Sequence, residues 1–359
     1  MAWFDSNRLN WPKNGDINAW ADFVETICIF SEDNAISLDE FMDYLTDDLT
    51  VTIDEINTAL NFNENFLKAA TPSIPKIKPE SDTDEEDMLE DDIVSEEREI
   101  LQSRCLILFE FLKSRKKYFG IYYPFYFHYN QINYIKITEE SIFHKLYRVL
   151  LLASEMNFFT HSDIVRMGHL FELLCQRPFS MLLPVLTEKK FFGAGGGVII
   201  PSDYRGNLRN KIKLLAKDLN IETSSLIDDP DELGPTGDAG LDWVGWMIFE
   251  DECDHQPVYF AQCACGTNWI DKQHETSLAS WRNYLNINQS IQCFHFMPRS
   301  FRRNSLKWFR STKIVQELSL IDRFRMMKIF SMEEERTIKD VLIPFSEILE
   351  ESYTFKYES

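Results

Sequence analysis

The sequence predicts an α/β protein of the α+β type, with a mainly helical N-terminal region followed by a region of strands and helices. Apolar residues recur at helical spacing over 17–69. Two later runs, 241–249 and 258–265, are instead continuous, apolar and aromatic, as buried strands are. A chain of 359 residues with 44% apolar and 14% aromatic content can form two or three domains with a sizeable core, which excludes wholesale disorder.

The first region, 1–70, is expected to contain only short helices. Ser37 and Thr52 each precede a glutamate by three residues, which is the pattern of a capping box at a helix start. The expected helices span 17–30, 37–48 and 52–70.

Most of the negative charge lies in the first 99 residues. The formal net charge is −21, from 58 acids against 37 bases, and residues 1–99 hold −20 of it. Segment 71–97 combines three prolines with the densest acidic block, so we expect a disordered acidic linker or insertion there. Because residues 100–359 are close to neutral, the net charge does not exclude a nucleic-acid partner.

Residues 98–158 are expected to form a helical region with one short hairpin. A long helical pattern begins at Glu96, the stretches YYPFYF and INYIKI can pair as strands, and 142–156 is a further helix.

Residues 159–300 contain the two strand-like runs, which we expect to pair as a β-hairpin. Before them we expect a helix over 162–176 capped by Ser162, a glycine-rich loop over 191–197 and a basic amphipathic helix over 207–220. The loop lacks the Gly-Lys-Ser/Thr of a phosphate loop, so it is interpreted as a flexible turn, and a close approach to a nucleic-acid backbone stays open. The last segment, 301–359, is basic first and then helical.

The sequence indicates a cytoplasmic protein. The N-terminal residues lack the basic and apolar regions of a signal peptide, and no run approaches the roughly 18 apolar residues of a membrane span. Seven scattered cysteines suggest reduced, mostly buried thiols. A zinc site is an alternative that the spacing disfavours, because a CxC inside an apolar run is not a paired CxxC grid. Its candidate ligands are Cys253, His255, Cys263, Cys265, His274, Cys293 and His295.

The expected hairpin suggests a site for chemistry on phosphates. A turn near 253–254 would place Asp242 opposite about residue 265, a few residues from Gln262. Two oxygen donors on adjacent strands can hold Mg²⁺ and leave room for water and phosphate oxygens. Lys272 could return from the next helix to stabilise charge on a phosphate or to orient a water. Taken singly, Asp242 could equally be a turn residue and Lys272 a surface charge.

The motif GDAGLD, followed by a strand that bears Gln262, resembles the Mrr-type branch of the PD-(D/E)xK restriction-endonuclease-like superfamily. In that branch G-D-G-G-I-D precedes Q-x-K, and an upstream helix carries Phe-Glu, as Phe171-Glu172 does here. The resemblance covers roughly residues 160–300. The chain is also similar to uncharacterised bacterial proteins of phage-defence loci with a GLDVVAW…GQCA.G.NW..K signature and a YPF element.

The resemblance implies a restriction-endonuclease-like core, in which helices flank a central mixed sheet. It makes Asp242 the central metal ligand, Glu172 a second carboxylate ligand and Gln262 a neutral carbonyl ligand of Mg²⁺ or Mn²⁺. Lys272 becomes the residue that stabilises the transition state or the attacking water. The sequence departs from the pattern twice: Ala264 stands where Q-x-K has its lysine, and Glu172 lies 70 residues before Asp242.

Two acid-free windows are candidates for phosphate contacts, although a solvated face whose stems cover apolar surface would have the same composition. The second window interleaves its bases with aromatic residues that could stack on nucleobases. The candidate contacts are Arg205, Arg209 and Lys213 in the first window and Arg299, Arg302, Arg303, Lys307 and Arg310 in the second.

The function expected from the resemblance is metal-dependent hydrolysis of phosphodiester bonds, in DNA first and with RNA left open, in bacterial phage defence. An alternative is a catalytically inactive adaptor of the same fold, which binds nucleic acid or a partner protein of the same defence system. The broken Q-x-K motif favours that alternative. A third hypothesis gives the acidic N-terminal region an interaction role, as a mimic of nucleic acid. The oligomeric state stays open.

Overall fold

The computed structural model describes residues 3–4, 11–12, 16–46, 52–60, 89–193, 201–228, 237–251, 253, 255–315 and 317–356. The chain divides into two compact units, each described by itself. Unit 1 comprises Leu152–Ser300 and Arg310–Ile348, and unit 2 comprises Ala2–Leu151, Phe301–Phe309 and Leu349–Ser359. The expected segment 301–359 is therefore shared between the two units.

The short N-terminal helices form where the sequence predicts them. Thr52 and Glu55 make a capping box, and Ser37 and Glu40 exchange the same pair of hydrogen bonds, at 2.6 and 3.1 Å. Beyond residue 60 the expected third helix lies outside the described residues. The helices in this part of the chain are α1 (Ile17–Phe30), α2 (Leu38–Thr46), α3 (Ile53–Ala59), α5 (Leu89–Phe119) and α6 (Ile142–Ser154).

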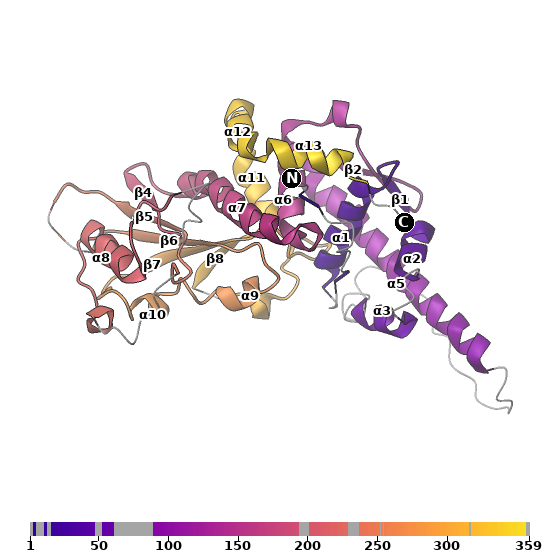
Figure 1. Ribbon diagram of the computed structural model, residues 1–359, viewed down its shortest axis with the longest axis horizontal. Coiled ribbons are helices and arrows are strands. Elements are labelled where there is room, and N and C mark those ends of the chain that lie inside the picture. The colour runs from indigo at the N-terminus through magenta and orange to yellow at the C-terminus, as the bar shows by residue number, and fades with distance from the viewer. Residues whose placement is uncertain are drawn as a thin grey trace. The chain divides into compact units, whose positions relative to one another are not determined.

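Helix α5 begins inside the segment expected to be a disordered linker. The helix starts at Leu89, so the expectation of disorder is wrong for 89–97, whereas 71–88 lies outside the described residues. Figure 1 shows α5 as the long magenta helix, and α1, α2 and α3 contact it.

The predicted hairpin of unit 2 is confirmed and carries a third strand. β2 (Phe125–His128) and β3 (Gln131–Tyr134) pair antiparallel. β1 (Ala35–Ser37), which the sequence did not suggest, pairs with the other side of β3 and gives the order β1-β3-β2.

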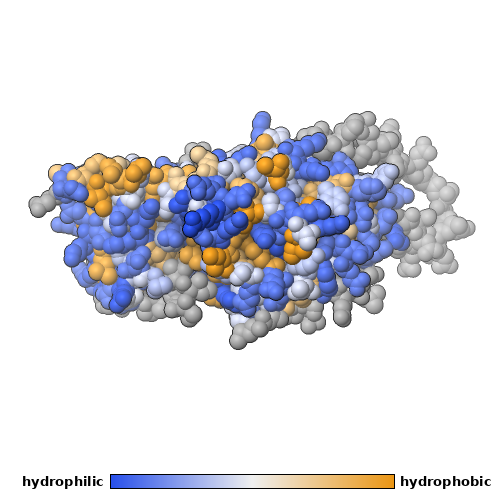
Figure 2. All heavy atoms as spheres, turned by 90° about the horizontal axis from the view of Figure 1, so that it is seen from above, coloured by the Kyte–Doolittle hydropathy of each residue, from blue (hydrophilic) through white to orange (hydrophobic). Residues whose placement is uncertain are grey.

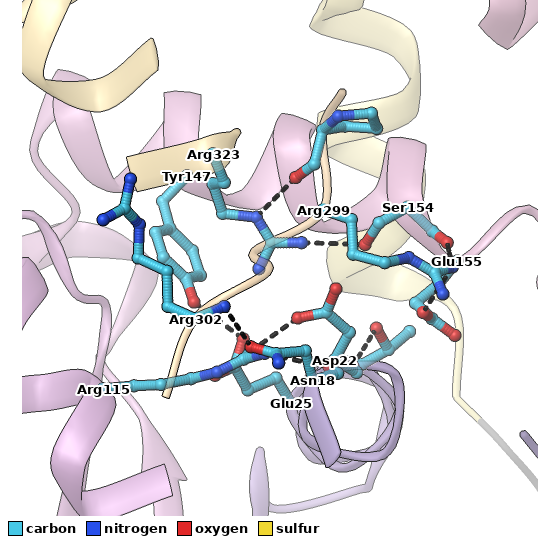
Figure 3. A network of polar contacts seen from close by, with 12 residues as sticks. Asn18, Asp22, Glu25, Arg115, Tyr147, Ser154, Glu155, Arg299, Arg302 and Arg323 are labelled. Atoms are coloured by element: carbon cyan, nitrogen blue, oxygen red, sulfur yellow. Dashed lines mark hydrogen bonds and ion pairs between the residues drawn. The ribbon is translucent and has the colours of Figure 1, made fainter. Parts of the chain in front are cut away.

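Unit 2 buries a cluster of charged side chains between α1 and α5. Arg115 donates to Asp22 at 2.5 Å and to Glu25 at 2.9 Å, and all three side chains are fully buried. Tyr123 and Tyr147 donate their hydroxyl protons to Glu25, at 2.7 and 2.8 Å. Figure 3 shows how Arg115 and Tyr147 approach the two carboxylates. Each Glu25 oxygen therefore has a donor, as buried charges require.

Unit 1 is built on a five-stranded mixed sheet of order β4-β5-β6-β7-β8. The pairs β4–β5 and β5–β6 are antiparallel, and β6–β7 and β7–β8 are parallel. The β5–β6 hairpin is the predicted one. The strands are β4 (Thr187–Phe191), β5 (Trp243–Met247), β6 (Val258–Cys263), β7 (Ile291–Phe296) and β8 (Leu318–Ile321).

Helices flank both faces of this sheet (Figure 1). The face that bears Val244 and Phe260 packs against Ile212 and Leu215 of α8 and Trp281 of α10 in one apolar cluster. On the other face, Phe179 of α7 meets Phe294 and Phe296 edge-on. The helices of unit 1 and of the C-terminal part are α7 (His161–Leu182), α8 (Leu208–Asp218), α9 (Trp269–Lys272), α10 (Leu278–Trp281), α11 (Arg323–Phe330), α12 (Glu335–Leu342) and α13 (Ser346–Thr354).

Three details of unit 1 correct the sequence-based expectations. β4 and β8 were not expected, and β8 extends the sheet beyond residue 300. The N-cap of α7 is Thr160 rather than Ser162. The glycine loop is described only as far as Gly193, and 194–200 lies outside the described residues.

The surface in Figure 2 is mainly hydrophilic, with smaller apolar areas among the hydrophilic side chains. Within the described part of the chain, no helix combines the length and apolar character that crossing a membrane requires.

Candidate active site

Backbone hydrogen bonds fix Asp242, just before β5, between β6 and the residues that follow β4. Its N–H donates to the carbonyl of Ala261 at 3.0 Å, and its carbonyl accepts from the N–H groups of Phe192 and Gly193, at 2.7 and 3.2 Å. Because Trp243 pairs with Ala261, the next position places Asp242 directly beside Gln262. The expected register, with Asp242 opposite about residue 265, is wrong by three residues, and the true register brings the two predicted ligands together.

The side chain of Asp242 is buried. The negative charges named around it, Glu172 and Asp238, outnumber the positive one, Lys272. Asp242 is 5% exposed, and its Oδ2 accepts the N–H of Cys263 at 2.6 Å. Burial raises the pKa of this carboxyl well above its usual value, and the charges of Glu172 and Asp238 raise it further. The Cys263 amide and Lys272 act in the opposite direction without cancelling the rise.

Glu172 approaches the same region from α7. Its carbonyl accepts the indole N–H of Trp243 at 2.9 Å, which ties the helix to the strand that follows Asp242. Burial, followed by the charge of Asp238, raises the pKa of Glu172 to about 7, although Lys272 lowers it. The Oε2 atom of Glu172 is buried and has no hydrogen-bond partner among the described residues.

Gln262 is held by one end of its amide. The residue is 4% exposed, and its Nε2 donates to Oε2 of Glu275. Its Oε1 is buried and, within the described ranges, accepts no hydrogen bond. A buried amide oxygen without a donor is costly, so this atom is available to a ligand or a water.

Lys272 is the cation of the site. It ends α9, and its charge lowers the pKa of both Glu172 and Asp242. It also lines a cavity of about 510 Å³, together with the 237–240 loop, Glu275, Ser280, Asn283 and Tyr284. Burial and mutual repulsion of the carboxylates outweigh this one lysine, which makes the site suited to an additional cation.

Three further residues of this region were not expected in a magnesium site, and one of them, His295, was named only for the zinc alternative. Asp238 lies in the quoted GDAGLD motif and adds negative charge, while its Oδ1 accepts the N–H of Gly240 at 2.8 Å. His295 is fully buried and pairs with Gln262 across β6 and β7. Both of its ring nitrogens lack partners in the described structure, and burial followed by Lys272 lowers its pKa to about 3. Glu275 is the third. Strand pairing places His295 next to Gln262, whereas Glu275 contacts Gln262 from the turn after α9. No sequence spacing signalled either neighbour.

The cysteines near the site behave as buried thiols. Burial raises the pKa of Cys263 and Cys265 well above the usual value, which opposes thiolate formation. Among the described residues, no three His, Cys, Asp or Glu side chains are arranged to hold a metal by themselves. Neither the zinc alternative nor a magnesium site gains or loses support from that observation.

The two basic windows divide into exposed and buried side chains. Arg299 is buried and donates to the carbonyl of Ser154 at 2.7 Å (Figure 3). Arg302 is buried in unit 2, where it lies over the Trp308 ring and donates to the carbonyl of Leu306 at 2.9 Å. Both arginines are therefore buried and donate to backbone carbonyls within their own unit, as structural arginines do.

The other predicted contacts lie closer to solvent. Lys213 is exposed but paired with Asp228 at 2.8 Å, and Arg209 is partly exposed. The remaining exposed ones are Arg205, Arg303, Lys307 and Arg310.

Comparisons of the chain with protein-family models, with curated proteins and with solved structures find no match. The site therefore has to be interpreted from its own chemistry.

Proposed function

We propose that unit 1 is a metal-dependent nuclease that hydrolyses phosphodiester bonds, with DNA as the expected substrate. The observation that carries the proposal is the pair Glu172, which is half-buried, and Asp242, which is buried. Burial and neighbouring carboxylates raise the pKa values of both carboxyls, and Lys272 does not cancel the rise. The mixed sheet between helices is compatible with the restriction-endonuclease-like core that the sequence resembles. The role in bacterial phage defence, with a partner protein, rests on that resemblance alone, and the proposed cytoplasmic location rests on the sequence features described above.

The donor set fits Mg²⁺ or Mn²⁺. Both ions prefer oxygen ligands, and Mg²⁺ commonly keeps several waters beside one or two carboxylates. Asp242, Glu172 and the free Oε1 of Gln262 would hold the ion, and its charge would offset the repulsion between the carboxylates. When bound, such an ion supplies Lewis-acid polarisation of a phosphoryl oxygen.

The protein's own groups supply the remaining functions. Lys272 is close enough to affect both carboxylates, so its ammonium can stabilise negative charge on a phosphate held there. Asp242 is oriented by the Cys263 amide. The exposed bases Arg205 and Arg310 of unit 1 are the proposed contacts to the nucleic-acid backbone, while Arg303 and Lys307 are exposed bases of unit 2.

The experiment is cleavage of supercoiled plasmid and of single-stranded DNA and RNA, with Mg²⁺, Mn²⁺ or EDTA. Asp242→Asn keeps the volume but removes the charge, so we expect it to lower the metal-dependent rate by at least about 100-fold, the upper end of the range for residues that support metal ligands. Asp271→Asn is the control, because this exposed aspartate lies on α9 outside the site. An Asp242→Asn variant as active as the wild type would contradict the assignment.

The inactive adaptor is the second candidate, and the observation that favours it is Ala264 in place of the Q-x-K lysine. Nucleic-acid binding without cleavage, with either metal present, would select it over the nuclease.

A further inference from the structure

The contact between Gln262 and Glu275 determines which end of the amide is free. A carboxylate can only accept hydrogen bonds, whereas an amide has a donor end and an acceptor end. Since Nε2 of Gln262 donates to Glu275, the opposite end of the amide is Oε1, the atom that is buried without a partner in the described part of the chain. Rotating the Gln262 amide by half a turn would place its Oε1 against Oε2 of Glu275. Two oxygens without a proton between them repel, so Glu275 opposes this rotation.

The backbone leaves room for this contact at a single glycine. Gly240 has φ +73°, and a Cβ there would lie 2.4 Å from both Cβ and Oε2 of Glu275 and 3.0 Å from Nε2 of Gln262. No other residue type could occupy this position without displacing one of the two side chains. Gly240 also stands two residues before Asp242, so the turn that delivers Asp242 is the one that accommodates Glu275.

We propose that Glu275 is a positioning residue of the candidate active site, which presents Oε1 of Gln262 to a bound divalent cation. The inference rests on the proposed function, because it needs a cation at Glu172, Asp242 and Gln262. Glu275 also places a negative charge beside Gln262, which is itself a neutral ligand. This accounts for an amide at position 262: a glutamate there would set two carboxylates against each other.

The first test is direct binding of Mn²⁺ to the full-length protein, measured by calorimetry and by the spin-resonance signal of free Mn²⁺. Glu275→Ala removes the acceptor, and we expect a loss of about 10-fold in affinity, within the range known for residues that support metal ligands. Glu275→Gln keeps a carbonyl acceptor and should lose less than about threefold, since most of the positioning is retained. Asp271→Ala removes an exposed carboxylate from α9, the helix just before Glu275, and should leave the affinity unchanged.

The outcomes separate the two proposals. Equal affinities of Glu275→Ala and Asp271→Ala, in a wild type that binds Mn²⁺, would overturn the role of Glu275 and leave the proposed function standing. A wild type that binds no Mn²⁺ would overturn both. Similar losses in Glu275→Ala and Glu275→Gln would show that only charge matters, which would also overturn positioning.

A reciprocal exchange provides the second test. Gln262→Glu should lower the Tm of the metal-free protein by about 2–4 °C, through the repulsion of two facing carboxylates. Adding Glu275→Gln restores one donor and one acceptor and should recover most of that loss. Two additive losses would show that the side chains act independently and would contradict the proposal.

Discussion

Each unit contains a pair of neighbouring carboxylates. The pair in unit 2 is neutralised by an arginine, whereas the pair in unit 1 is not neutralised by its lysine. In unit 2, Asp22 and Glu25 share Arg115, and two tyrosines complete the coordination of Glu25. In unit 1, Asp238 adds a further negative charge to Glu172 and Asp242, and Lys272 adds a positive one. Burial alone would lower the pKa of Arg115, yet Glu25 and Asp22 raise it well above its usual value, because each ion stabilises the other.

The difference separates a structural cluster from a site. A fully satisfied cluster has nothing left to bind and contributes to one specific packing. The pair in unit 1 retains repulsion and, among the described residues, one buried oxygen without a hydrogen-bond partner, Oε2 of Glu172. This arrangement costs stability unless a ligand relieves it. Removing a charge should therefore lower the free energy of unfolding in the cluster of unit 2 and raise it in the pair of unit 1.

The largest effect is expected from Arg115→Met. This change leaves Asp22 and Glu25 buried without their cation, which typically costs about 3–5 kcal/mol. Urea unfolding followed by fluorescence measures the loss. Lys113→Met, a partly exposed lysine on the same helix that pairs with Glu110, is the control and should cost under about 1 kcal/mol. Equal losses in the two variants would remove the contrast between the units.

A change of opposite sign is expected from Glu172→Gln. The folded-state pKa of Glu172 is raised from 4.5 to about 7, so its contribution to stability is fully present below about pH 4.5 and is lost as the pH rises through about 7. The free energy of unfolding of the metal-free wild type should therefore fall by about 2 kcal/mol between pH 5 and pH 8. In Glu172→Gln this fall should be absent. Unfolding in urea with EDTA, at both pH values, measures it.

Two further measurements make this prediction specific. Glu188→Gln, an exposed glutamate on β4, should leave the pH dependence of wild type intact. Mn²⁺ added to wild type at pH 8 should restore the stability that the carboxylates lose, because a ligand of the folded state stabilises it. A Glu172→Gln variant as pH-dependent as wild type would contradict the unsatisfied state of the pair.

The smallest effect is expected from Tyr147→Phe. It removes one of the donors to Glu25 but leaves Arg115 and Tyr123 in place to stabilise the charge, so the cost should be about 1 kcal/mol, the net value of a typical hydrogen bond. Thermal unfolding detects it. A neutral result would show that the cluster has more donors than Glu25 needs.

Local sequence signals predicted most of the elements. Capping residues such as Thr52 and the apolar runs of β5 and β6 act within a few residues, so their outcome can be inferred without the rest of the chain. β1, β4 and β8 were missed because they are short, and their pairing depends on partners that lie far away in sequence.

The same distinction applies to the site. Asp242, Gln262, Glu172 and Lys272 were found through a motif, but the register that sets Asp242 beside Gln262 was not. Whether a basic residue is exposed also depends on tertiary packing. Arg299 and Arg302 look like their exposed neighbours in the sequence, and only the fold shows that backbone carbonyls occupy them. Glu275 carries no local signal, and His295 was suggested only as a zinc ligand.

The interleaving of the two units has a consequence for modularity. The segment Phe301–Phe309 belongs to unit 2, although unit 1 precedes and follows it in the chain. A fragment ending at residue 300 would lack β8 and leave β7 as a bare sheet edge, which invites aggregation. A single cut at residue 300 therefore does not separate the whole five-stranded sheet from unit 2. Residues 159–300, which the sequence suggested as one domain, contain β4 to β7 and lack β8.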